Sequence, residues 1–175
     1  MSSQVPRTIE NPADQETVTF LAYPEETDDG ALRYEVRFRA GGKSAHSHFH
    51  PTQDQRLEVV SGQMGFEVEG VSKIYGPGEK VHVPKATKHY QWNAGDVEIV
   101  VFQEQFPAGE MESFLRNSFG LVRDGRMNTL HAAATLAFYR DVMTHAGWQR
   151  WVLVLIAPIA GLLGYKKSYE EYERR

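Results

Sequence analysis

Hydrophobic and polar residues alternate along much of the chain, as they do on β-strands with one buried face. In residues 32–39, four apolar residues alternate with four charged ones, which puts one face in a core and the other in water. Shorter candidate strands, separated by turn-like residues, cover 17–23, 57–60, 64–69, 74–75, 80–83, 90–92 and 97–103. Many short strands at this spacing favour an all-β barrel or jelly roll.

After the last of these strands the apolar positions recur at helical spacing. Residues 111–122 and 128–146 carry this pattern, and Asn128 stands where a helix N-cap is expected. Residues 148–163 are strongly apolar and predict a third helix. The predicted fold class is therefore mainly β, a jelly-roll barrel followed by C-terminal α-helices.

These patterns divide the chain into three parts. Residues 1–14 are polar, contain two prolines and show no periodicity, which predicts a flexible N-terminal arm. Residues 15–106 hold the barrel strands, and residues 107–175 form a helical extension packed on the barrel or on a partner subunit. A chain of 175 residues is long enough to bury one substantial core.

The third helix contains residues 151–163, thirteen uncharged residues that Pro158 interrupts. A membrane-spanning helix needs ~20 apolar residues, so we expect no membrane insertion. A helix that is apolar on all sides is usually buried against another element. The barrel is the favoured partner, a second subunit of a homodimer comes next, and a membrane surface is the least favoured.

Composition and charge exclude several classes of function. A net charge of -4 and a pI near 6.0 leave no basic surface for nucleic acid. The chain has no cysteine, so any metal site must use histidine, carboxylate or amide groups. The first residues lack an apolar segment of signal-peptide length, and a cytoplasmic location is the expectation.

The most informative chemistry lies in a cluster of histidines. His46, His48 and His50 occupy every second position, so on a strand they share one face. His89 follows thirty-nine residues after His50, within another patterned segment. Neutral imidazoles that converge from such positions can bind a metal ion.

Two longer motifs contain these histidines, and the first resembles G-x5-H-x-H-x(3 or 4)-E-x6-G of the cupin superfamily. This sequence has the same spacing and departs from the motif only at Gln55. It reads Gly42, five residues, His48, one residue, His50, four residues, Gln55, six residues and Gly62. There the family has glutamate.

The second motif of that family is G-x5-P-x-G-x2-H-x3-N. Gly78, Pro84, Ala86, His89 and Asn93 match its spacing, with alanine in place of one glycine. The resemblance covers residues 17–106, and it implies a double-stranded β-helix, the jelly-roll barrel that the strand pattern already favours.

The resemblance also implies a metal centre. His48, His50 and His89 would be three ligands of a divalent transition metal, Fe, Mn, Ni or Zn, and Gln55 would complete or border the site. An amide brings no charge, so the metal would be a stronger Lewis acid and would be held less tightly. Asp54 is the alternative ligand under the shorter spacing, but strand parity favours Gln55.

The remaining histidines are assigned separately. His46 shares the face of His48 and His50, and it is a candidate hydrogen-bond donor to a metal ligand, substrate contact, replacement ligand or general base. Its alternative is a position at the wet rim of the barrel. His82, His131 and His145 are expected to be surface or satisfied histidines, the last two on helices.

The resemblance implies a metal-dependent enzyme acting on a small-molecule substrate, of dioxygenase, isomerase or lyase type. His46 and Gln55 are the candidate catalytic residues beside the metal ligands. The alternative is a non-catalytic cupin that binds or senses a small molecule, which the loss of the glutamate keeps open.

Overall fold

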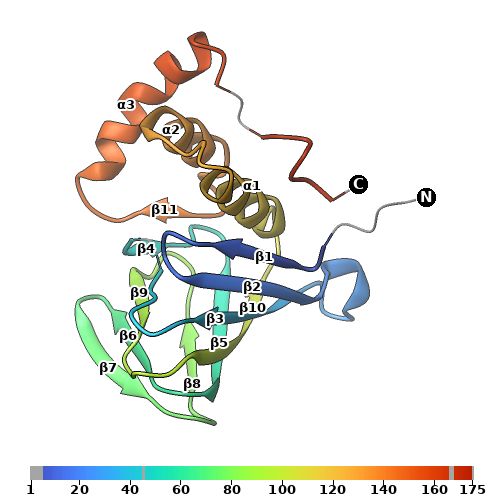
Figure 1. The fold of residues 1–175 in the computed structure, drawn as a ribbon, viewed down its shortest axis with the longest axis vertical. Helices are drawn as coiled ribbons and strands as arrows, with labels where there is room; N and C mark the ends of the chain where they lie inside the picture. Colours follow the sequence, from blue (N-terminus) through green and yellow to red (C-terminus); the bar gives the residue numbers. More distant parts are fainter. Residues whose placement is uncertain (1–5, 45, 166–167, 175) are drawn as a thin grey trace.

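The computed structural model describes residues 6–44, 46–165 and 168–174. Two antiparallel sheets form a barrel, and three α-helices gather over one end of it (Figure 1). The strands are β1 (Thr8–Asn11), β2 (Glu16–Ala22), β3 (Leu32–Phe38), β4 (His48–Phe49), β5 (Asp54–Ser61), β6 (Met64–Val68), β7 (Val71–Tyr75), β8 (Lys80–Val83), β9 (His89–Asn93), β10 (Ile99–Phe106) and β11 (Thr144–His145). The helices are a 3₁₀ turn (Pro24–Glu26), α1 (Met111–Arg123), α2 (Thr129–Phe138) and α3 (Gln149–Leu162).

The larger sheet has the strand order β1-β2-β3-β10-β5-β8, and the smaller has the order β11-β4-β9-β6-β7. Side chains from both sheets meet in one hydrophobic core between them. The prediction of a mainly β fold, a jelly roll with C-terminal helices, is confirmed. In this topology β4 and β9 lie side by side although they are distant in sequence, and this pairing builds the site described below.

Strand β3 shows why the alternation predicts the barrel. Leu32, Tyr34, Val36 and Phe38 face the core and are at most 4% exposed. Burial of side chains of this size contributes roughly 2 kcal/mol each. The charged residues between them face outward, where Arg33 lies 2.8 Å from Glu104 on β10. That half-exposed ion pair contributes little stability, so the buried face holds the strand in register.

Two local predictions differ from the structure. The predicted arm includes β1, which pairs with β2 and buries Ile9 against the core, so residues 8–11 form part of the sheet. The helix predicted over 128–146 ends at Phe138, and Thr144 and His145 form β11 beside β4. In both places a partner strand supplies the backbone hydrogen bonds, and the local pattern of apolar and polar residues does not indicate that partner.

The helical extension packs on the barrel in part. Helix α1 lies against β1, whereas α3 packs mainly against α2 and leaves Leu155 and Leu162 74% and 89% exposed. The side chain of Asn128 accepts a hydrogen bond from the backbone N–H of His131, which confirms the predicted N-cap of α2. None of the described helices is both long and apolar enough to span a bilayer.

Candidate metal centre

Three histidines converge inside the barrel from two neighbouring strands. His48 on β4 stands directly opposite His89 on β9, and His50 follows two residues later on the same face. Their ring centroids lie 4.4 Å apart for His48 and His89 and 5.2 Å for each of the other pairs. One nitrogen of each ring lies within 4.8 Å of the others. The rings converge because His48 and His50 point to the same face of one strand and because β4 pairs with β9, which carries His89.

Hydrogen bonds to the backbone fix the orientation of each ring. Nδ1 of His48 lies 2.8 Å from the carbonyl of His46, and Nδ1 of His89 lies 2.9 Å from that of Thr87. Nδ1 of His50 lies 2.8 Å from the carbonyl of Val142, just before β11. A carbonyl oxygen only accepts, so each Nδ1 carries the proton. In a neutral ring, Nε2 then keeps the lone pair that a metal needs.

Burial keeps these rings neutral. It lowers the pKa of His48 to about 3, with the neighbouring His89 adding to the effect, and the pKa of His50 to about 3, with His48 adding to it. Burial and the nearby His50 lower the pKa of His89 to about 4. At neutral pH no proton has to leave before the three nitrogens can bind a cation.

The side chain of Gln55 points into the barrel, and that of Asp54 points outward. Gln55 is 4% exposed and lines the cavity above the histidines. Asp54 accepts a hydrogen bond from the backbone N–H of Lys85 at 2.8 Å and lies 3.7 Å from the exposed His82. The structure therefore leaves Gln55 as the candidate for the position where the family motif has glutamate.

Buried glutamines orient the Gln55 amide. Its Nε2 donates to Oε1 of Gln103 at 2.8 Å, and Nε2 of Gln103 donates to Oε1 of Gln91 at 3.1 Å. This series of hydrogen bonds uses the amide nitrogen of Gln55, whose Oε1 is left buried without a hydrogen-bond partner. A buried carbonyl oxygen without a partner is costly unless a cation or donor reaches it.

The donor set fits a divalent transition metal. Nε2 of His50, Nε2 of His89 and Oε1 of Gln55 are all buried and without a partner among the described residues. Imidazole nitrogens suit zinc, iron, nickel and manganese, and a neutral amide oxygen is an acceptable additional ligand. These orphaned atoms are what such a site requires before an ion enters it.

The turn between β8 and β9 delivers His89 with local strain. Ala86 has a φ of 61° in the left-handed region that favours glycine, which is the residue of the family motif at this position. Its N–H donates to the carbonyl of His50 at 2.7 Å, so the strained turn also holds His50 in place. Asn93, at the end of the motif, donates to the carbonyls of Phe38, Arg39 and Val97 and closes the end of β9.

Another pair of histidines stands at the edge of the site. His46 is exposed, and its ring meets that of His145 at a centroid distance of 4.9 Å. His145 is on β11 opposite His48, so its predicted place on a helix is wrong. Burial, with His46 nearby, lowers the pKa of His145 to about 4. No sequence signal indicated His145, because a strand of two residues has no periodicity.

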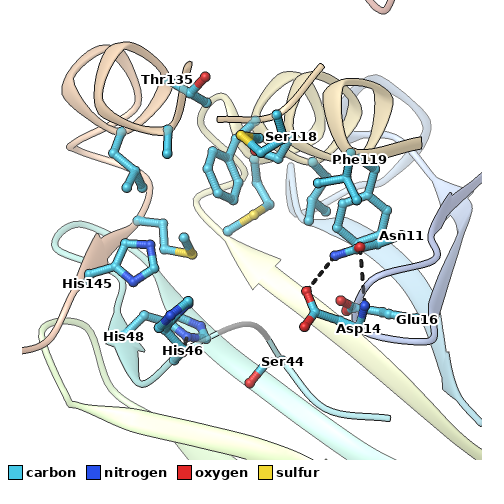
Figure 2. A pocket seen from close by; sticks show the side chains of 18 of the residues that line it. Asn11, Asp14, Glu16, Ser44, His46, His48, Ser118, Phe119, Thr135 and His145 are labelled. Atoms are coloured by element: carbon cyan, nitrogen blue, oxygen red, sulfur yellow. Dashed lines mark hydrogen bonds between the residues drawn. The ribbon is translucent and has the colours of Figure 1, made fainter. Parts of the chain in front are cut away.

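A cavity of about 580 Å³ extends from the histidines to the helices. Figure 2 shows His46, His48 and His145 at one side, and Ser118, Phe119 and Thr135 reaching in from the helices. The helices α1, α2 and α3 all contribute side chains to its wall. They lie over the end of the barrel, so His48 and His50 are at the barrel end of a partly covered chamber.

Two carboxyl groups line the other side of the cavity. Asp14 accepts a hydrogen bond from Nδ2 of Asn11 at 2.8 Å, as Figure 2 shows, and Glu16 lies beside this pair at the start of β2. Burial and the charge of Asp14 raise the pKa of Glu16 from 4.5 to about 8. At neutral pH the folded protein therefore keeps this carboxyl largely protonated.

This raised pKa predicts a pH-dependent effect of Glu16→Gln on stability. Folding favours the protonated carboxyl, so its stabilising contribution is full below pH 4.5 and is lost as the pH rises through about 8. We expect the variant to gain about 1 kcal/mol relative to wild type between pH 5 and pH 9, with allowance for partial exposure. Urea unfolding at both pH values measures this. Glu10→Gln on the exposed face of β1 is the control, and an equal gain there would contradict the explanation.

Comparisons with known proteins agree with the fold. Residues 34–103 match the family model described as a cupin domain. A cupin-like protein from Thermotoga maritima is 23% identical, with a TM-score of 0.51 over 61% of this chain and 81% of that chain. An RmlC-like cupin from Shewanella frigidimarina is 21% identical, with a TM-score of 0.50 over 59% and 86%. At these identities the structures show the fold alone. No curated protein matches the sequence significantly.

Proposed function

Because the chain belongs to the cupin superfamily through residues 34–103, we propose that it is a metal-dependent enzyme acting on a small organic molecule. The reaction would be of dioxygenase, isomerase or lyase type. The observation that carries the proposal is the convergence of three neutral imidazoles at the inner end of a covered cavity. Buried titratable groups in a cavity of this kind are typical of catalytic sites.

His48, His50 and His89 would hold a divalent Fe, Mn, Ni or Zn ion through Nε2, and the free Oε1 of Gln55 would complete or border the site. When bound, such an ion supplies Lewis acidity to a substrate oxygen. The backbone carbonyls that accept from the Nδ1 atoms orient the rings and raise their basicity. An ion held by three protein nitrogens would keep a coordination position for a substrate atom.

The other residues of the chamber would bind substrate and exclude water. The helical cap removes the reacting groups from bulk solvent, which strengthens electrostatic interactions inside. His46, at the accessible edge beside His145, is the candidate to exchange a proton between substrate and solvent. Gln55, anchored through Gln103, would orient a substrate oxygen if it does not ligate the ion.

The second candidate is a non-catalytic cupin that binds or senses a small molecule. The observation that favours it is Gln55, because an uncharged amide lowers the affinity for a cation relative to a carboxylate. In that case the chamber would be the functional element and the three histidines would be polar contacts for its ligand. Both candidates share the cavity and differ in whether metal is required.

Metal content separates the two candidates. Wild-type protein purified without chelator is expected to carry close to one transition-metal ion per chain, and His89→Ala is expected to lose it, because two imidazoles and an amide hold a divalent ion weakly. The matched control is His82→Ala, since His82 is exposed on β8 and is not one of the three converging histidines. Elemental analysis measures the ion, and oxygen uptake with candidate substrates then distinguishes an oxygenase from an isomerase or lyase.

A wild-type protein that stays free of metal after reconstitution would overturn the enzyme proposal and favour the binding protein. Equal metal loss in His82→Ala and His89→Ala would place the ion outside the three-histidine site. The far-UV circular dichroism of both variants shows whether the barrel is intact.

A further inference from the structure

The wall of the cavity opposite the histidines is apolar. Side chains from all three helices form it: Met111, Phe114, Leu115, Phe119, Leu136 and Val152. Figure 2 shows this side of the chamber above His46 and His48, with Phe119 projecting from α1. Polar groups gather on the barrel side, and three of them, Gln55, Gln91 and Gln103, largely satisfy one another. A bound molecule would therefore bury its body against the hydrocarbon of the helices and place a polar group towards the barrel.

The electrostatics of the cavity oppose an anion. Among the described residues that line it there is no lysine or arginine. The acidic lining residues are Asp14 and Glu16, and the glutamines of the lining are uncharged and hydrogen-bonded to one another. A carboxylate or phosphate carried into this chamber would lose its hydration and find no cation among those residues.

One polar side chain among those on the helical side is buried without a hydrogen-bond partner. Thr135 of α2 lines the cavity, is 2% exposed, and its hydroxyl has no hydrogen-bond partner. Helical threonines usually bond to a carbonyl of the preceding turn, so a buried free hydroxyl is unusual. A hydroxyl or carbonyl group of a bound molecule would satisfy it.

On the basis of the proposed function, we infer that the substrate or ligand is an uncharged, mainly apolar molecule with an oxygen group at the histidine end. The chamber volume of about 580 Å³ lies in the range of pockets for small organic molecules. Apart from an ion held by the three histidines, the described lining offers no cationic lysine or arginine to a phosphorylated or carboxylated compound. Molecules carrying a second small polar group would gain a contact at Thr135.

The test compares three probes that share one ring system: 2-naphthol, naphthalene-2-carboxylate and 2-naphthyl phosphate. Isothermal titration of the full-length protein, freed of metal with a chelator, is expected to give at least tenfold tighter binding of the neutral probe than of either anion. The same order is expected in His89→Ala, because there a carboxylate cannot gain from coordination to a bound ion. Equal or tighter binding of an anionic probe to His89→Ala, or no binding of 2-naphthol, would overturn the inference.

A positive charge introduced into the apolar wall of the cavity provides a second test of the preference for neutral molecules. Leu115→Arg puts a cation on the cavity side of α1, and it is expected to reverse the preference towards naphthalene-2-carboxylate. Val154→Arg adds the same charge on the exposed face of α3, outside the cavity lining, and should leave the order unchanged. If Leu115→Arg fails to fold, the wild-type and His89→Ala titrations still decide the question.

The outcome is independent of the metal measurement. Preference for 2-naphthol with no metal in the wild type keeps the apolar chamber and removes the enzyme proposal. One ion per chain in the protein as purified, together with preference of the metal-free protein for the anions, keeps the enzyme proposal and removes this substrate class.

Discussion

Gln55→Glu is expected to tighten the binding of a divalent transition metal on the order of 100-fold. The substitution keeps the side-chain length and adds a negative charge beside the three imidazoles, where the free Oε1 of Gln55 now stands. An added unit charge a few ångströms from a cation is worth about 3 to 4 kcal/mol at the effective dielectric of a protein site, and removal of that carboxylate from water reduces the gain. Each 1.4 kcal/mol that remains corresponds to about a tenfold change in affinity.

The buried glutamines can adapt to this change. A glutamate cannot donate to Oε1 of Gln103, so Gln103 has to turn its amide, and Gln91 has to turn in response. The cost is about one hydrogen bond, roughly 1 kcal/mol, which is smaller than the expected electrostatic gain. The metal-free variant should therefore be less stable than wild type, and the metal-bound variant more stable.

Competition with a chromophoric chelator measures the affinity. The matched control is Gln63→Glu, which adds the same charge at an exposed position between β5 and β6 and should leave the affinity unchanged. Unchanged affinity in Gln55→Glu, together with metal loss in His89→Ala, would show that position 55 lies outside the coordination sphere. The residue would then be left with a role in orienting substrate.

The sequence predicts the barrel well because its strands are amphipathic. On β3 and β5 a shift of one residue would exchange the buried and exposed faces, so the alternation specifies both strand and orientation. The same parity places His48 and His50 on one face and turns Gln55, rather than Asp54, inward. Convergence with His89 needed the long-range pairing of β4 and β9, which only the family resemblance indicated.

The chamber could not be predicted from local patterns. Its cap depends on how α1, α2 and α3 pack together. Helical periodicity indicates which face of each helix is buried, but it does not indicate which element that face packs against. The end of α2 at Phe138 and the turn to β11 are likewise set by tertiary contacts, among them the hydrogen bond between His50 and the carbonyl of Val142. His145 therefore entered the site without any sequence signal.

Gly65→Ala is expected to destabilise the fold by about 3 kcal/mol. Gly65 on β6 stands opposite Trp92 on β9, and the indole ring lies across the position that a Cβ would occupy. The overlap involves the body of the ring, so a small side-chain rotation does not relieve it, and overpacking of this kind costs about 1–3 kcal/mol or more. Because β9 also carries His89, a shifted indole would disturb the strand that places this histidine beside His48 and His50.

Urea unfolding measures the loss, and two variants identify its cause. Gly161→Ala on α3 is the matched control, because its new methyl group meets no atom within 4 Å and a helical alanine is favoured by about 1 kcal/mol. In the double variant Gly65→Ala with Trp92→Leu, the smaller side chain should recover part of the stability lost by Gly65→Ala, measured against Trp92→Leu alone. If the two substitutions are additive, the indole is not the obstacle, and the backbone of β6 itself requires glycine.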